Sequence, residues 1–309
     1  MKAIFWKELA DHFSSWRFFI FMIIILLASM FATYTASQTI MDNSSDTESI
    51  FVRIFSASGD ALPSFLWFIT LLGPFLGIIF GFDVINGERM RGTLSRILSQ
   101  PVFRDSVING KFLAGLVAVS VILAGIILMS CGLGLRALGI APDLSEIIRI
   151  TLFFFLSLLY VGFWLALGVL CSVLFKSTIV SVLMTIAVWI FFAIFMSMIA
   201  GVIADESHPI DQYSSPDTFL AHDKLEKDVQ RISPVYLFNE ASDTILNPEK
   251  RTLRGLVRVS EVQSMVPGSV SVRQSLSLIW PHIVTLIALI SICFVASYIK
   301  FMKEEIRAT

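Results

Sequence analysis

Six long segments that contain no Asp, Glu, Lys or Arg constrain this chain more than any other feature of its sequence. Each is close to the roughly 20 mostly apolar residues that a helix needs to cross the hydrocarbon core of a bilayer. We therefore predict an all-α integral membrane protein with six transmembrane helices. The segments are Phe18–Ala36, Ser64–Phe82, Phe112–Leu135, Ile150–Phe175, Ser177–Ala204 and Ser275–Ile299.

The composition of the chain agrees with a membrane protein. Hydrophobic residues make up 56% of its 309 residues and charged residues only 15%, whereas soluble domains have about 45–50% and 25%. One soluble core cannot bury this excess. The net charge of −1 gives no indication of nucleic-acid binding. Cys131, Cys171 and Cys293 all lie within apolar segments, which argues against a disulfide or zinc framework.

The distribution of basic residues predicts that both termini are cytoplasmic. Short cytoplasmic segments carry an excess of Lys and Arg, while long loops cross the membrane largely regardless of charge. With the amino terminus inside, the short outer loops hold only Arg53, Arg136 and Arg149. The basic residues on the inner side are then Lys2, Lys7, Arg17, Arg89, Arg91, Arg96, Arg104, Lys111, Lys176, Lys300, Lys303 and Arg307.

Residues 1–16 have the spacing of a helix that lies along the inner surface of the bilayer. Phe5, Leu9, Phe13 and Trp16 recur at helical intervals, with charged residues elsewhere around the helix. The competing interpretation is a cleaved signal peptide with Phe18–Met30 as its apolar core. Its leader would be long and would contain acidic residues, so we favour a retained first span. The residues assigned to this interfacial helix are Trp6, Lys7, Glu8 and Leu9.

Gly73, Gly77 and Gly81 give the second span two overlapping GxxxG units on one face. Small residues let helix backbones approach closely in lipid. We therefore expect this face to pack on another helix.

The long connection between the fifth and sixth spans, residues 205–273, predicts an extracytoplasmic insertion of two or three helices. Asp205–Thr218 is rich in Asp, Ser and Pro and is expected to be extended. Leu225 and Val229 have helical spacing, and Pro234 and Pro248 bracket a further expected helix. A flexible loop with transient helices is the alternative. The domain organisation is then 1–204 for the interfacial helix and five spans, 205–273 for the insertion, and 274–309 for the sixth span and tail.

The polar interval Gly81–Lys111 lies between the second and third spans. Met90, Leu94, Ile97 and Leu98 form an apolar stripe at helical spacing, and Pro101 follows it. We predict an amphipathic helix over about 84–100, lying against the inner face of the bundle. Periodicity alone does not distinguish an ordinary interfacial helix from one that contacts another protein.

Two partial matches to nucleotide-binding motifs fail. Gly110-Lys111 resembles the end of a P-loop, but the first glycine is missing and Phe112 replaces the Ser or Thr that holds magnesium. Gly132-Leu-Gly134 fits a dinucleotide fingerprint only on paper, because it lies at the end of a predicted membrane helix. The four histidines lie in different segments, and we predict neither an enzyme nor a metal site. His282, in the last span, is expected to hydrogen-bond to a neighbouring helix.

The residues of the polar interval resemble the coupling loop of type-2 ATP-binding-cassette (ABC) transporter permeases. That loop has a Gly-Glu-Arg/Lys-x-x-Gly-Thr-Leu run, then a proline and a Gly-Lys pair that opens the third span. Here these are Gly87-Glu88-Arg89-Met-Arg91-Gly92-Thr93-Leu94, Pro101 and Gly110-Lys111. Lys7-Glu8-Leu9 is similar to the family's amino-terminal interfacial helix. The subclass with nitrous-oxide-reductase maturation, sodium-extrusion and peptide-antibiotic export permeases is the most similar.

The resemblance implies a prokaryotic plasma-membrane permease, which pairs with a second copy or a related permease and binds two cytoplasmic ATPase subunits. Those subunits would bind ATP and Mg, and this chain would carry no cofactor. The resemblance assigns ATPase coupling to Glu88, Arg89, Arg91, Gly92, Thr93 and Leu94. It also implies export of a substrate. The uncharged, Phe-rich spans suit a hydrophobic or amphipathic substrate.

The alternative from another class is a membrane anchor or assembly factor whose insertion at 205–273 binds an extracytoplasmic partner. An intramembrane enzyme, a third class, lacks candidate residues.

Overall fold

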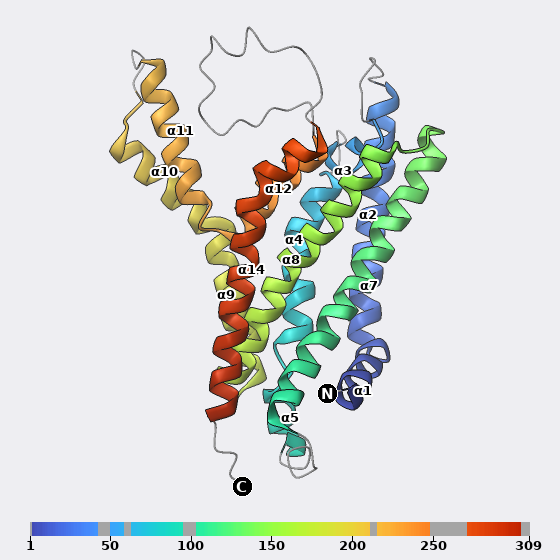
Figure 1. Cartoon of the computed structure of the whole chain (residues 1–309), viewed down its shortest axis with the longest axis vertical. Helices are drawn as coiled ribbons and strands as arrows, with labels where there is room; N and C mark the ends of the chain where they lie inside the picture. Colours follow the sequence, from blue (N-terminus) through green and yellow to red (C-terminus); the bar gives the residue numbers. More distant parts are fainter. Residues whose placement is uncertain are drawn as a thin grey trace.

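The computed structural model describes residues 2–42, 50–58, 63–94, 103–210, 215–247 and 271–303. Within these ranges the secondary structure is helical, and no strand is present. Figure 1 shows a bundle of long helices with α1 (Lys2–Phe13) and the last turns of α14 (Val272–Lys303) at one end. We call this the α1 end. The opposite end, which carries α11 (Pro216–Gln230), is called the α11 end.

Among the described residues, six helices are long and apolar enough to cross a membrane, in agreement with the predicted number of spans. α8 ends at Leu174 and α9 begins at Thr178, so a tight turn connects the fourth and fifth spans. The fifth span contains a π-helical turn, which separates α9 from α10. The spans are α2 (Trp16–Asp42), α4 (Phe65–Gly81) with α5 (Asn86–Met90), α7 (Arg104–Leu138), α8 (Leu144–Leu174), α9 (Thr178–Ile190) with η1 (Phe191–Phe195) and α10 (Met196–Ser207), and α14.

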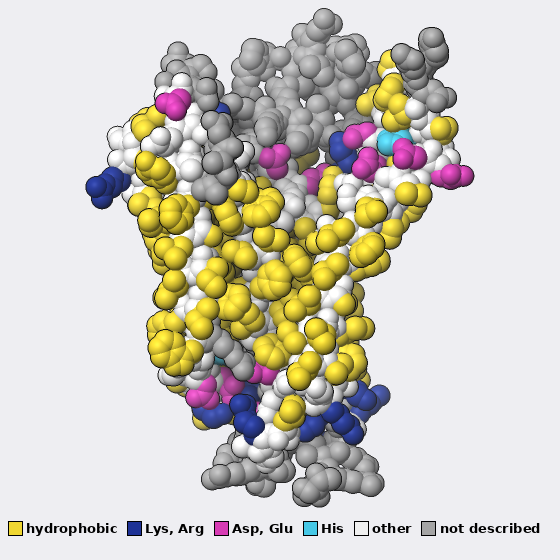
Figure 2. All heavy atoms as spheres, turned by 180° about the vertical axis from the view of Figure 1, so that it is seen from behind, with side chains coloured by type: hydrophobic (Ala, Val, Ile, Leu, Met, Phe, Trp, Pro, Cys, Tyr) yellow, Lys and Arg dark blue, Asp and Glu magenta, His cyan; other side chains and the backbone are white. Residues whose placement is uncertain are grey.

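The surface of the molecule has the distribution of side chains that a bilayer requires. Figure 2 shows a broad hydrophobic band across one face of the bundle, with charged side chains gathered towards its two ends. Hydrocarbon offers no partner for a backbone polar group, and helices satisfy these groups internally. The chain is a multi-pass membrane protein.

The centre of the bundle is the contact between α4 and α8. A Cβ atom on Gly77 would lie 2.5 Å from Val161 O and 2.8 Å from Leu165 N, both backbone atoms. One on Gly81 would lie 3.0 Å from the Cα of Gly168. The glycine face of the second span therefore lies directly on the backbone of α8, and no side chain separates the two helices.

The described part of the connection between the fifth and sixth spans contains two helices, within the two or three that were predicted. α11 spans Pro216–Gln230 and α12 spans Pro234–Leu246, and Ser215 and Ser233 accept hydrogen bonds at their amino-terminal ends. The expectation of an extended Asp205–Thr218 is wrong in part, because α10 continues to Ser207 and α11 begins at Pro216. Positions 211–214 and 248–270 of this connection lie outside the described residues.

α12 packs within the bundle and shares its main hydrophobic core. The ring of Phe238 stacks on that of Tyr160 in α8, with ring centroids 4.3 Å apart and planes 8° from parallel. The hydroxyl of Tyr160 donates to Thr70 O of α4 at 2.9 Å. Arg149 of α8 is buried and donates to Ile245 O of α12 at 2.9 Å. α12 thus connects α4, α8 and α14 near the α11 end (Figure 1).

Candidate functional site

α5, at the α1 end, is fixed to α8 by hydrogen bonds at its first turn. Ser172 Oγ on α8 accepts from the backbone N–H groups of Ile85 (2.9 Å) and Asn86 (3.1 Å). The side chain of Asn86 donates to Ser177 O, in the turn between α8 and α9, at 3.4 Å. These bonds satisfy N–H groups that a helix start leaves without partners. The position of α5 is therefore coupled to that of two spans.

A buried ion cluster joins α5 to α1 and α7. Lys111 Nζ of α7 lies 2.8 Å from Glu88 Oε1 of α5 and 2.9 Å from Glu8 Oε1 of α1. The side chain of Lys111 is 3% exposed. Unpaired charges at such burial would be strongly unfavourable, so each side chain requires the others in place. We call these residues the Glu8–Lys111–Glu88 cluster.

The charges around Glu8 stabilise its ionised form. Burial alone would raise the pKa of Glu8, but the neighbouring Lys111 and Lys7 outweigh burial and lower it. Lys7 Nζ lies 3.1 Å from Glu8 Oε1. Burial also lowers the pKa of His12, one turn further along α1, and its ring packs edge-on against Phe80 of α4 with ring centroids 5.1 Å apart.

The cluster forms one wall of a cavity of about 660 Å³ between α1, α4, α5 and α7. Positively charged, negatively charged and uncharged polar side chains line the cavity in addition to the cluster. One oxygen of Glu88, Oε2, is buried and has no hydrogen-bond partner among the described residues. The lining includes Asp11, His12, Asp83, Arg91 and Thr93.

The amphipathic helix predicted over 84–100 is interrupted. α5 ends at Met90, and Gly92 adopts a left-handed conformation with φ +69°. Glycine takes this conformation at little steric cost and commonly ends a helix. Thr93 and Leu94 then resume a helical conformation, and positions 95–102, which contain Ile97, Leu98 and Pro101, lie outside the described residues.

The residues predicted to couple to an ATPase fall into two groups. Glu88 and Leu94 face inward, with exposures of 5% and 2%. Leu94 packs in a small core with residues of α7, α8 and α14. Arg91, Gly92 and Thr93 form an exposed turn, and Arg89 is half-buried. Among the described residues predicted to couple, the exposed ones are therefore those of this turn, which we call the Arg91–Thr93 turn.

The interfacial helix is closely packed on α7. A Cβ atom on Gly110 would lie 3.1 Å from the side chain of Ile4 and 3.4 Å from the backbone nitrogen of Phe5. Among the residues assigned to this helix, Trp6 is 65% exposed and Lys7 is exposed, whereas Leu9 is buried and Glu8 is directed at Lys111. One face of α1 contacts protein and the other is free to contact lipid.

Sequence reasoning missed the role of Lys111, which it treated only as part of a failed P-loop and of a family motif. A lysine next to an apolar span is common on the cytoplasmic side, so the sequence did not distinguish Lys111 from the other basic residues there. Glu8 and Glu88 lie close to apolar spans in sequence. The proximity of these three charged residues to apolar spans was the only indication of the cluster in the sequence. Their contact with one another depends on how α1 packs against α7.

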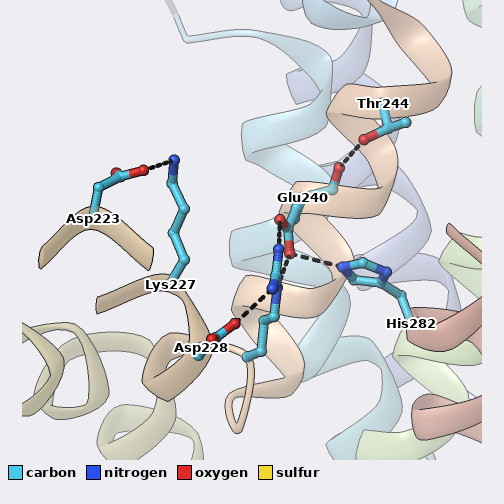
Figure 3. Close-up of polar contacts among 7 residues, drawn as sticks. Asp223, Lys227, Asp228, Glu240, Thr244 and His282 are labelled. Carbon is cyan, nitrogen blue, oxygen red and sulfur yellow. Dashed lines mark hydrogen bonds and ion pairs between the residues drawn. The ribbon is translucent and has the colours of Figure 1, made fainter. Parts of the chain in front are cut away.

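A second polar network lies towards the α11 end, between α11, α12 and α14 (Figure 3). Arg231 donates to both oxygens of Glu240, at 2.9 and 2.7 Å, and His282 Nε2 lies 2.7 Å from Glu240 Oε2. The expected hydrogen bond of His282 to a neighbouring helix is therefore present. Burial would raise the pKa of Glu240, but Arg231 and His282 reverse this effect and lower it to about 2. This network connects α12 to the last span.

Within the described ranges, no group of three or more His, Cys, Asp or Glu side chains is arranged to hold a metal ion.

A comparison with protein families provides the identity that this geometry alone does not. A comparison with curated proteins finds no match. A family model described as "ABC-2 family transporter protein" matches residues 2–306, which include the interfacial helix, the six spans and the α5 region. This chain therefore belongs to the ABC-2 family of transporters, as a membrane permease component.

Proposed function

We propose that this chain is the permease of an exporter driven by ATP hydrolysis in a separate subunit, and that the ATPase contacts the Arg91–Thr93 turn. The observation that carries this proposal is the Glu8–Lys111–Glu88 cluster. It ties the short helix next to the turn to α1 and α7, while Ser172 ties it to α8. A push on the turn would therefore move three helices and would not be lost in a flexible loop.

The route from the turn to the membrane runs through α4 and α8. α5 follows α4 after a short turn, and the glycine face of α4 contacts the backbone of α8 without intervening side chains. Two helices in backbone contact cannot slide without a large rearrangement. We infer that α4 and α8 move together when the turn is displaced. The membrane subunit itself carries out no chemistry.

The α1 end is the cytoplasmic end in this proposal. Lys2 and Lys7 of α1 and Lys300 and Lys303 of α14 lie at this end together with α5. An excess of basic residues next to the spans is typical of the cytoplasmic side. A cytoplasmic ATPase could then reach the turn.

The family relationship supports the permease over the membrane-anchor alternative. We propose two ATPase subunits and a second permease copy, as the resemblance implies. Export of a hydrophobic or amphipathic substrate is also part of the proposal, because the spans contain no charged pathway through the hydrocarbon core.

The test is the ATPase activity of the purified transporter, with charge reversal at the exposed turn. Arg91→Glu should abolish the stimulation of ATP hydrolysis by the permease while the spans still assemble. Lys224→Glu is the matched control, because Lys224 is exposed on α11 at the opposite end. Equal stimulation in wild type and Arg91→Glu would contradict coupling through this turn. Equal losses in both variants would contradict its specificity.

A further inference from the structure

A second cavity lies between α2 and α7, at the α11 end of the bundle, and the proposed coupling does not use it. Its volume is about 580 Å³. Met30, Phe31 and Met41 line it from α2, and Leu133, Arg136 and Ala137 from α7. The wall is largely apolar, so the cavity suits a hydrocarbon chain better than a polar solute.

The length and position of the cavity match one leaflet of a bilayer. The α2 residues from Met30 to Met41 extend about 16 Å along the helix at 1.5 Å per residue. Half of a hydrocarbon core of about 30 Å is about 15 Å. Arg136 lies in the last turn of α7, which ends at Leu138. Its guanidinium therefore belongs at headgroup depth when the apolar wall lies in the leaflet.

The polar groups of the wall distinguish Arg136 from its neighbours. Ser37 Oγ donates to Thr33 O at 2.7 Å, and Tyr34 Oη accepts from Gln38 Nε2 at 2.9 Å. Their hydrogen bonds are satisfied within α2. Arg136 is exposed, and no acidic side chain in the described part of the chain forms an ion pair with it. A cation at the edge of an apolar cavity complements an anionic headgroup.

We propose that this cavity, called the groove below, binds one acyl chain of an anionic phospholipid, whose headgroup pairs with Arg136. Charge complementarity and the match to one leaflet both favour a lipid over a helix from a second copy of this chain. An apolar helix seated in the groove would leave the guanidinium without a partner at its end. The lipid would stabilise the contact between α2 and α7.

The experiment is native mass spectrometry of the purified protein with equimolar phosphatidylglycerol and phosphatidylcholine. We expect wild type to retain phosphatidylglycerol preferentially and Arg136→Gln to lose this preference about five-fold, the effect of one basic residue at a membrane surface. Arg273→Gln is the matched control. Arg273 is exposed in the first turn of α14, away from the groove residues, and its variant should behave as wild type.

A second variant tests the apolar part of the groove without changing its charge. Ala137 is exposed and lines the groove, so Ala137→Phe should fill it without disturbing the core. Loss of bound lipid in a folded Ala137→Phe protein supports the proposal. Retention of both lipids by Ala137→Phe, or equal losses in Arg136→Gln and Arg273→Gln, would overturn it. Conversion of a dimer to a monomer by Ala137→Phe would overturn it in favour of a subunit interface.

Discussion

Lys111 Nζ lies 2.8 Å from Glu88 Oε1, although the two residues are 23 positions apart and belong to different helices. Their side chains are 3% and 7% exposed. Glu8 completes the cluster from a third helix, so three sequence segments share one buried cation. Glu8 of the interfacial helix and Glu88 of α5 therefore share one cationic partner, the ammonium group of Lys111.

Removal of Lys111 alone should destabilise the protein more than removal of Lys111 and Glu88 together. Lys111→Met leaves Glu88 buried without a counter-charge, and we expect a loss of about 3–5 kcal/mol in the free energy of unfolding. Glu88→Leu with Lys111→Met should recover part of this loss, because a buried pair is often replaceable by apolar residues. Glu8 loses Lys111 in both variants and keeps Lys7, 3.1 Å away, as its counter-charge. Unfolding titrations in mild detergent measure both variants. Additive losses in the single and double variants would contradict a direct interaction between them.

Because α4 and α8 are in close contact, we expect even an added methyl group on α4 to reduce the stability of the protein. Gly77→Ala would place a Cβ atom 2.5 Å from Val161 O, so the helices must separate. We expect a loss of about 1–3 kcal/mol in the free energy of unfolding from such overpacking.

Gly125→Ala in α7 is the matched control for Gly77→Ala, because no atom lies within 4 Å of a Cβ built there. Alanine also has the higher helix propensity, so this variant should be neutral or slightly stabilising. Equal thermal stability of the two variants would be inconsistent with backbone contact at Gly77.

The stacking of Phe238 on Tyr160 predicts that α12 depends on one aromatic side chain for its place in the bundle. Phe238 is fully buried, and Phe238→Ala should reduce the free energy of unfolding by about 3–5 kcal/mol. Phe219→Ala on α11 removes the same atoms from a residue that is 46% exposed and should have little effect. Limited proteolysis of residues 234–246 would report release of α12. Equal protection in both variants would contradict the assignment of α12 to the core.

The network at the α11 end predicts a loss of stability in acid. The pKa of Glu240 is lowered from its ordinary value of 4.5 to about 2 in the folded protein. Its contribution to stability is therefore present above about pH 4.5 and is lost as the pH falls from there towards 2. Glu240→Gln should remove about 1–3 kcal/mol at neutral pH and flatten this part of the pH dependence. An unchanged acid profile in Glu240→Gln would show that another group is responsible.

The number of spans could be predicted from the sequence because hydrocarbon imposes a length and a composition on every span. Charge-free runs such as Ile150–Phe175 leave little alternative to a helix that crosses the bilayer. Ile150–Phe175 and Ser177–Ala204 are separate spans for the same reason, since one helix across Lys176 would exceed the thickness of any bilayer. The helical spacing of Leu225 and Val229 predicted α11, and Pro234 marks where α12 begins. The start of α11 at Pro216 was not predicted, because Pro216 lies in a segment that was expected to be extended.

The sequence did not predict the geometry of the residues that make up the candidate site. Periodicity joined Met90 and Leu94 into one helix, whereas the left-handed Gly92 separates them. The spacing of apolar residues does not indicate whether a glycine adopts a left-handed backbone conformation. Glu88 appeared to be a surface contact, because its partner Lys111 is distant in sequence. The burial of Phe238 likewise depends on a tertiary contact with Tyr160, which no local pattern contains.

The measurement that tests the coupling proposal most directly is photo-crosslinking from the Arg91–Thr93 turn to the ATPase that copurifies with the chain. A photo-reactive amino acid in place of Thr93 should crosslink to that subunit, and the yield should change when ATP binds. The same amino acid in place of Lys224 should give no such product, because it lies at the opposite end of the bundle. Crosslinking from position 224 without crosslinking from position 93 would contradict the account.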